Sequence, residues 1–143
     1  MTLLDAARRA RETGQPQLLV EAMPFASYLG LTLELRGDEL VCTLPADRRF
    51  LGNPVLDSLH GGATAGLLEC TATLALLWHK PREVVPRTID FSIDFLLSGK
   101  MQPAFAHARL LKFGRRIANV HVDAWQTDRA RPIGAGHGNF LLA

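Results

Sequence analysis

The sequence predicts an α+β fold in which a curved antiparallel sheet wraps around one long apolar helix. Residues 63–78 (ATAGLLECTATLALLW) form an apolar stretch of helical length. On both sides of it, segments with strand character follow one another through short connections, which imply antiparallel neighbours. A helix that is apolar on most sides must be covered on most sides, and a curved sheet can cover it.

The chain is expected to be one domain, residues 1–143, with a helical lead-in over residues 1–28 and a core over residues 29–143. In the lead-in, residues 3–12 predict a short amphipathic helix. Residues 17–22 predict a second one, which stops near Pro24. These helices are expected to cover one end of the core.

Two strands and a loop are predicted between the lead-in and the long helix. Residues 31–45 contain two strand patterns separated by the turn residues Arg36-Gly37-Asp38, as in a hairpin. Residues 46–59 are rich in turn residues and predict a loop. At its end, Asp57 and Ser58 are candidate N-caps of the long helix.

Four strands are predicted after the helix, at residues 88–95, 104–113, 117–127 and 133–142. The first alternates strictly, so Thr88 is expected on the face that also carries Asp90, opposite Phe91. In the last strand, three glycines share one face, which predicts the close approach of another element: Gly134, Gly136 and Gly138.

Charge and cysteine content exclude several classes of function. A net charge of +2 does not support binding to nucleic acid or to an anionic membrane. Cys42 and Cys70 have neither CxxC spacing nor a disulfide framework, so a reducing cytoplasm is the expected location. His79, His107, His121 and His137 have no ligand-like spacing, so no metal site is expected.

No leader and no membrane span are expected. Residues 1–17 carry five charged side chains and no apolar core of a signal sequence. Residues 61–78 are at the short limit of the roughly 17–25 residues that cross a bilayer. Because Glu69 lies at the centre of this stretch, a buried helix is the better interpretation.

Glu69 and the glycines before the helix are the candidate chemical groups. A carboxylate within an apolar helix is costly to bury unless it has partners or a function. Gly61 and Gly62 leave backbone N–H groups free at the helix start, where the helix dipole favours developing negative charge. An acid and an oxyanion-type donor on one element indicate acyl chemistry.

Several short motifs together resemble the hotdog-fold thioesterases of the phenylacetate-degradation (PaaI-like) and 4-hydroxybenzoyl-CoA type. The matching segments are Pro24-Phe25-Ala26, Leu29-Gly30-Leu31, Asn53-Pro54, His60-Gly61-Gly62, Glu69, Thr88-Ile89-Asp90-Phe91 and Gly114-Arg115. The resemblance implies a five- or six-stranded antiparallel sheet around a central helix. It also implies a homodimer, often paired into a homotetramer, that hydrolyses acyl-CoA without a metal or bound cofactor.

The resemblance also implies roles for individual residues. The N–H of Gly61 would polarise the thioester carbonyl, and Glu69 would act as nucleophile or general base. A hydroxyl partner is supplied by Thr73 one turn later or by Thr88 on the following strand. Asn53 would face the substrate, although the stretch from Asn53 to the HGG motif is one residue longer here than in the common pattern.

Three further residues are expected near the substrate. His60 is expected to shape the turn before the helix through hydrogen bonds rather than to act as a base, because a helix N-terminus disfavours positive charge. Arg115 and Arg116 follow a turn glycine and could reach the phosphates of CoA, or could form a solvated turn.

The spacing of Gly61 and Glu69 predicts an oligomer. Eight residues of helix separate them by roughly 12 Å along the axis, so one carbonyl cannot touch both. If both serve one thioester, they come from different subunits, and a two-fold interface would then build two equal sites.

Two alternatives remain at this point. A hotdog dehydratase or hydratase needs a histidine besides the helix acid; residues 48–54 contain none, and only His60 keeps that alternative open. The other alternative is a non-catalytic acyl-CoA-binding module, against which the intact HGG motif and Glu69 argue. The sequence does not distinguish aromatic from aliphatic acyl groups.

Overall fold

The computed structural model describes residues 1–143, and each predicted helix and strand is present with bounds within about two residues of those expected. The elements, in chain order, are α1 (Leu3–Thr13), α2 (Gln17–Ala22), α3 (Pro24–Tyr28), β1 (Thr32–Arg36), β2 (Glu39–Leu44), a 3₁₀ turn η1 (Arg48–Phe50), β3 (Leu51–Asn53), β4 (Ser58–Leu59), α4 (Gly61–His79), β5 (Arg87–Phe95), β6 (Ala104–Phe113), β7 (Ile117–Trp125) and β8 (Gly134–Leu141).

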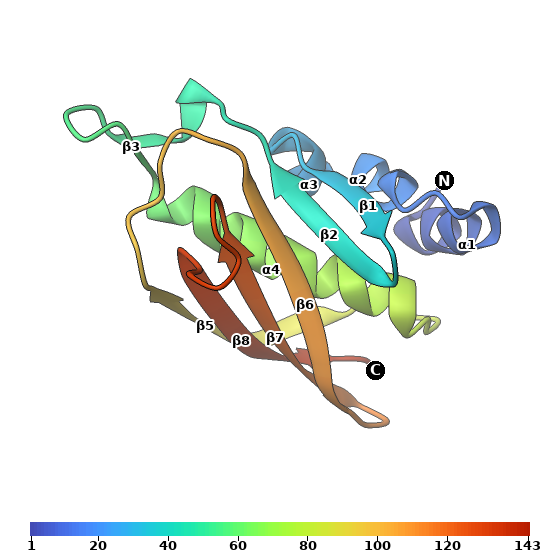
Figure 1. The fold of residues 1–143 in the computed structure, drawn as a ribbon. Coiled ribbons are helices and arrows are strands. Elements are labelled where there is room, and N and C mark those ends of the chain that lie inside the picture. Colours follow the sequence, from blue (N-terminus) through green and yellow to red (C-terminus); the bar gives the residue numbers. More distant parts are fainter.

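Six strands form one antiparallel sheet in the order β1-β2-β6-β7-β8-β5. Helix α4 lies against one face of this sheet, which curves around it (Figure 1). Strands β1 and β5 are the two edges. This is the hotdog architecture, so the predicted fold class is confirmed.

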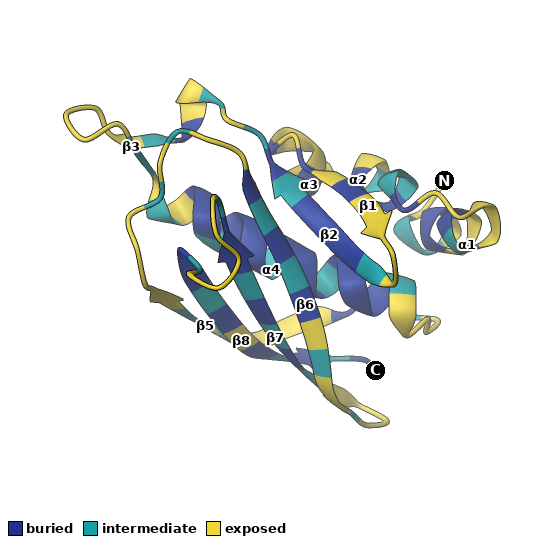
Figure 2. Cartoon of the chain, in the orientation of Figure 1, coloured by how far each residue is buried: buried dark blue, intermediate teal, exposed yellow.

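The core lies between α4 and the inner face of the sheet. Four alternate residues of β7 have at most 1% of their surface exposed, whereas the intervening residues are half-buried or exposed: Ala118, Val120, Val122 and Ala124. Figure 2 shows a similar alternation along β8 and along the first half of β6, from Ala104 to Ala108. Hydrophobic burial along the inner face therefore fixes which side of each central strand meets the helix.

Helices α1 and α3 contact α4, and α2 packs against α1, α3 and β1, so the N-terminal helices cover part of the surface that the sheet leaves free. A Cβ added to Gly66 would lie 3.0 Å from the Leu29 side chain and 3.3 Å from the ring of Phe25, so glycine permits this close packing. Near the other end of the helix, the guanidinium of Arg11 donates to the Leu77 carbonyl at 2.7 Å. That bond satisfies one of the carbonyls that a helix C-terminus leaves unpaired.

Residues 46–59 differ from the predicted loop. They form η1 and a short β3–β4 hairpin, which projects near the start of α4 (Figure 1). The predicted N-caps are also wrong, because Asp57 pairs with Arg48 at 3.0 Å and Ser58 belongs to β4. The cap is His60, whose Nδ1 accepts the N–H of Gly62 at 2.8 Å.

The predicted strict alternation of β5 is wrong at its start. Thr88 pairs with Phe140 and Asp90 pairs with Asn139, so Ile89 is an extra residue in the ladder. Such a bulge reverses the facing of the residues before it relative to those after it. Thr88 therefore lies on the same face as the fully buried Phe140, toward α4, rather than on the face of Asp90.

The glycines of β8 allow a close approach, as predicted. A Cβ on Gly136 would lie 2.7 Å from the ring of Phe91, and one on Gly138 would lie 2.6 Å from the same ring. The Phe91 ring therefore lies flat over β8, where it meets Phe140 edge-on at 6.1 Å between ring centres. None of the helices is long and apolar enough to cross a membrane.

Candidate active site

A groove of about 510 Å³ runs between α4, α3 and β5. On α4 its floor is a stripe of small residues with helical spacing that leads to Glu69, the one carboxylate of this helix. The remaining lining is mostly apolar. The lining residues are Phe25, Gly62, Ala65, Gly66, Glu69, Thr88, Ile89, Asp90, Phe91 and Ile93.

The carboxylate of Glu69 is half-buried and has one side-chain partner. The hydroxyl of Thr88 donates to Oε2 of Glu69 at 2.7 Å. This contact depends on the bulge at Ile89, because a regular strand would turn Thr88 away from the helix. The other carboxylate oxygen, Oε1, accepts no hydrogen bond within the chain and is free for a water or a substrate.

The start of α4 presents one backbone donor without an intramolecular partner. The N–H of Gly62 is bound by His60, and the next two N–H groups donate to the His60 carbonyl at 3.0 and 3.3 Å. The N–H of Gly61 makes no such bond. At the positive end of a 19-residue helix, this free donor is suited to an oxyanion.

An aromatic ring from β5 lies beside that donor. A Cβ on Gly61 would lie 3.3 Å from the ring of Phe95, which is itself 60% exposed. Neither this neighbour nor Phe25 of α3 was predicted as a site residue from the sequence, because both lie more than 30 residues from the HGG motif and no local pattern signals the contact.

Within one chain, Thr73 makes no hydrogen bond to the Glu69 carboxylate and Asn53 does not line the groove. Thr73 lies one turn beyond Glu69 and is half-buried, but no hydrogen bond joins the two side chains, so Thr88 is the hydroxyl partner within the chain. Asn53 is exposed at the β3–β4 hairpin, where its Oδ1 accepts the N–H groups of Val55 at 3.0 Å and Leu56 at 3.3 Å. Asn53 thus stabilises the hairpin turn.

Arg115 and Arg116 lie in the exposed turn between β6 and β7. This turn is near the C-terminal end of α4, since Arg82 just beyond that helix donates to the Gly114 carbonyl at 3.2 Å. The two arginines are therefore at the opposite end of the helix from Gly61. Within one chain they do not join the groove.

The cysteines are not candidates for nucleophilic chemistry. Burial raises the pKa of Cys70 to about 12, with a further contribution from the adjacent Glu69 charge. Burial likewise raises the pKa of Cys42 to about 12. Because the thiolate is the reactive form, both thiols are inert near neutral pH. No group of three or more His, Cys, Asp or Glu residues is arranged to hold a metal ion.

Comparison with known proteins supports an assignment to a family. The thioesterase superfamily model matches residues 56–133, more than half of the chain, and these residues include the HGG motif, Glu69 and Thr88. The chain belongs to the thioesterase superfamily. It is accordingly a thioester hydrolase.

Individual relatives agree with this assignment. The medium/long-chain acyl-CoA thioesterase YigI of Salmonella typhimurium is 30% identical over 128 residues, covering 79% of this chain and 82% of that protein. A crystal structure of a Chromobacterium violaceum protein is 31% identical, with a TM-score of 0.79 over 97% of both chains. A Bacillus halodurans protein crystallised with CoA shares the fold at 20% identity, with a TM-score of 0.75 over 99% of this chain and 91% of that one.

Proposed function

We propose that this protein hydrolyses acyl-CoA thioesters, with Glu69 as the group that attacks the carbonyl carbon or activates a water. The observation that carries the proposal is the Glu69 carboxylate, held at 2.7 Å by Thr88 within a mostly apolar groove. Its free oxygen is available to abstract a proton from water or to attack directly. In the first case, the leaving CoA thiolate takes a proton from the protonated carboxyl group. In the second, the carboxylate displaces the CoA thiolate to form a mixed anhydride, the thiolate takes a proton from water, and a second water hydrolyses the anhydride to the free acid and the Glu69 carboxylate.

The N–H of Gly61 is the proposed donor to the carbonyl oxygen. It is the one N–H of the first helical turn that neither His60 nor the helix occupies. Charge that develops on the oxygen in the tetrahedral intermediate would meet this donor and the helix dipole. In this proposal His60 and Gly62 define the turn, and Thr88 orients the carboxylate; Thr73 is the alternative hydroxyl.

The proposed site is shared between two subunits. Helix α4 is continuous from Gly61 to His79, so Gly61 and Glu69 of one chain remain roughly 12 Å apart along its axis. The edge strand β5 supports a partner at this position, because one side of its backbone is unpaired. Ile89, Phe95 and Leu96 are also at least half exposed there. A two-fold contact across β5 would cover these side chains and bring two α4 helices together.

The substrate is proposed to carry an aliphatic acyl chain. The relatives that support this are named medium/long-chain acyl-CoA thioesterases, and Phe25, Ile89 and Ile93 give the groove an apolar wall. In a dimer, the partner's Arg115 and Arg116 could reach the CoA phosphates, since the turn that carries them lies near the end of α4 remote from Gly61.

Release of free thiol from acyl-CoA tests the proposal. The wild-type protein is expected to hydrolyse one or more members of a panel from acetyl-CoA to palmitoyl-CoA, with an aromatic acyl-CoA included. Glu69→Gln should lower kcat by about 10²–10⁴-fold, because the amide can neither take a proton nor attack. Unchanged turnover in a correctly folded Glu69→Gln protein would remove the assignment.

The contacts of His60 argue against the hydratase alternative, which needs this histidine as a base. In the structure Nδ1 of His60 already accepts the Gly62 N–H, so the ring proton must be on Nε2 and that nitrogen is a donor. His60 is thus engaged in capping α4.

A further inference from the structure

The outer face of the sheet carries a pair of histidines that the proposed site does not use. His121 of β7 and His137 of β8 are directly opposite each other in the antiparallel register. Their ring centres are 5.4 Å apart, with 41° between the ring planes. Both residues lie on the outer face, because their neighbours in sequence, such as Val120 and Val122, are buried toward α4.

All four ring nitrogens of this pair are free. Neither histidine takes part in a side-chain hydrogen bond or an ion pair, and His121 is half-buried while His137 is exposed. By contrast, His60 caps α4, and His107 faces the Glu39 carboxylate at 3.5 Å. The pair therefore differs from the other outer-face histidine in having nitrogen lone pairs that no protein group occupies.

The separation of the rings fits a shared metal ion. Two imidazoles bound to one ion at about 2.0–2.1 Å, with about 90–110° between the bonds, have ring centres about 4.5–5.3 Å apart. The observed 5.4 Å is close to this range, and small side-chain rotations would close the difference. The backbone that carries the pair is held by the ladder between two neighbouring central strands, so little has to be ordered on binding.

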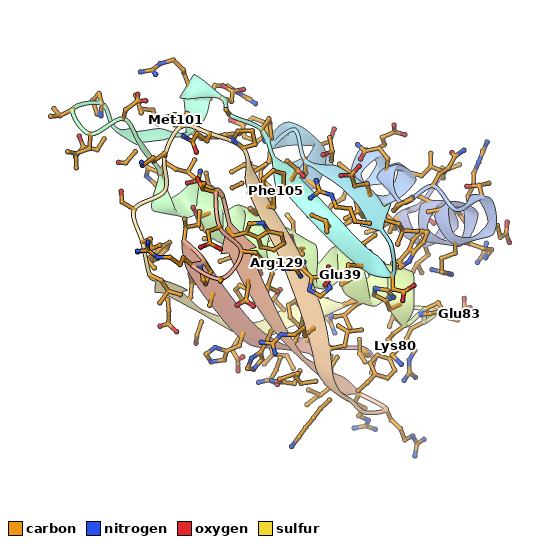
Figure 3. All side chains as sticks on the ribbon, viewed as in Figure 1. Glu39, Lys80, Glu83, Met101, Phe105 and Arg129 are labelled. Atoms are coloured by element: carbon orange, nitrogen blue, oxygen red, sulfur yellow. The ribbon has the colours of Figure 1, made fainter.

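The charges around the pair favour a cation. Asp123 is two residues from His121 on the same face of β7. On β5, Asp94 is two residues from Ser92, which is opposite His137. The opposing cation is Arg109, which is across from His121 on β6. Arg129, also on the outer face, is neutralised by Glu39 through bonds of 2.7 and 2.8 Å (Figure 3).

We propose that His121 and His137 form a two-histidine site for a divalent first-row transition metal such as Ni²⁺, Cu²⁺ or Zn²⁺. Imidazole suits these ions, and affinity for such a site should be highest for Cu²⁺. Water would complete the coordination, because no third histidine, cysteine or carboxylate is grouped with the pair. Because the site lies on the sheet face opposite α4, it is separate from the groove that contains Glu69.

Titration of the untagged full-length protein with Ni²⁺ by calorimetry tests the proposal. The wild-type protein should bind one ion per chain. His121→Ala and His137→Ala should each weaken binding by at least about 100-fold, because a single imidazole loses the chelate effect. The matched control is His107→Ala, which removes another outer-face histidine and should bind Ni²⁺ like the wild type. Equal binding by the wild type, His121→Ala and His137→Ala would overturn the proposal.

Two further readouts separate chelation from loss of structure. Bound Cu²⁺ should show electron-spin coupling to two nitrogens in the wild type; coupling to one or none would overturn the proposal. Zn²⁺ should also raise the Tm of the wild-type protein, since a ligand that binds the native state stabilises it. It should leave the Tm of a protein that carries both His121→Ala and His137→Ala unchanged, and equal Tm values of this protein and the wild type in EDTA would show that both fold alike.

Discussion

Strands β5 and β7 have the same alternating pattern in the sequence but behave differently in the structure. In β7 each residue from Ala118 to Ala124 lies on the face that the alternation predicts. In β5 the extra residue Ile89 breaks the ladder, and 51% of its apolar side chain is exposed. One strand is at the centre of the sheet and the other is at its edge.

The difference follows from what each strand contacts. Strand β7 is paired on both sides and buries one whole face, so a shift by one residue would expose its core side chains. Strand β5 is paired only with β8, and an edge tolerates a bulge at little cost. The bulge turns Thr88 onto Glu69, so the irregular strand is the one that contributes to the candidate site.

Among the changes that test this comparison, the largest effect is expected at the Gly61 donor, which lies next to β5. Gly61→Pro removes the N–H at the first helical position, where proline is well tolerated, and the extended backbone of His60 (φ −65°, ψ 132°) suits a following proline. We expect kcat to fall by about 10²–10³-fold. Gly61→Ala is the matched control, because it introduces the same contact with the Phe95 ring but keeps the donor. Equal loss in both variants would indicate a steric effect and would contradict the role of the N–H.

Removing the Thr88 hydroxyl should abolish the contribution of β5 to the carboxylate. Thr88→Val should lower kcat by about 10–100-fold, as expected for a lost hydrogen bond to a charged group. Thr88→Ser keeps the hydroxyl and should retain most activity. Thr73→Val should change kcat little; a larger loss there than in Thr88→Val would assign the hydroxyl role to Thr73.

Substitutions on the two faces of the regular strand β7 should differ strongly in their effect on the free energy of unfolding. Val120→Ala leaves a cavity in the core and is expected to lower the free energy of unfolding by about 2 kcal/mol. Ile117→Ala on the same strand, where 48% of the side chain is exposed, should stay within about 0.5 kcal/mol. Urea unfolding of both variants measures this, and equal losses would show that the alternation does not describe β7.

The smallest effect concerns the two buried thiols. Cys42 and Cys70 should resist alkylation in the native protein at pH 8, because burial raises the pKa of both to about 12. Each folded-state pKa lies above the ordinary value of 9.0, so the folded protein holds these two protons more tightly than the unfolded chain. The contribution of the protonated thiols to the free energy of unfolding is therefore fully present below pH 9 and is lost as the pH rises toward 12. Rapid labelling without unfolding would contradict the burial of these side chains.

Much of the fold could be predicted from the sequence because periodicity reports burial. The apolar stretch around Glu69 predicted α4, and the glycines of β8 predicted the close approach that the Phe91 ring makes. The hydrogen bond from Gly62 to His60 agrees with the expectation that His60 shapes this turn, although Asp57 and Ser58 were expected as the N-caps. The bulge at Ile89 could not be predicted, because an extra residue in a ladder is visible only against its partner strand.

The same limit applies to the candidate site. The sequence supplied Gly61, Glu69 and two possible hydroxyl partners, and helical spacing alone favoured Thr73 as a neighbour of the carboxylate. The hydrogen bond from Thr88 joins residues 19 positions apart and depends on the edge position of β5. Helical spacing could identify neighbours on α4 but not a partner on another element.

Subunit mixing tests the central claim, a site built from Gly61 of one chain and Glu69 of its partner. Co-expressed Gly61→Pro and Glu69→Gln chains, each inactive alone, form mixed dimers with one intact site. Random pairing would then restore about a quarter of the wild-type activity, because half of the dimers are mixed and each has one intact site of two. No recovery in purified mixed dimers would contradict the shared site and require that each chain act alone.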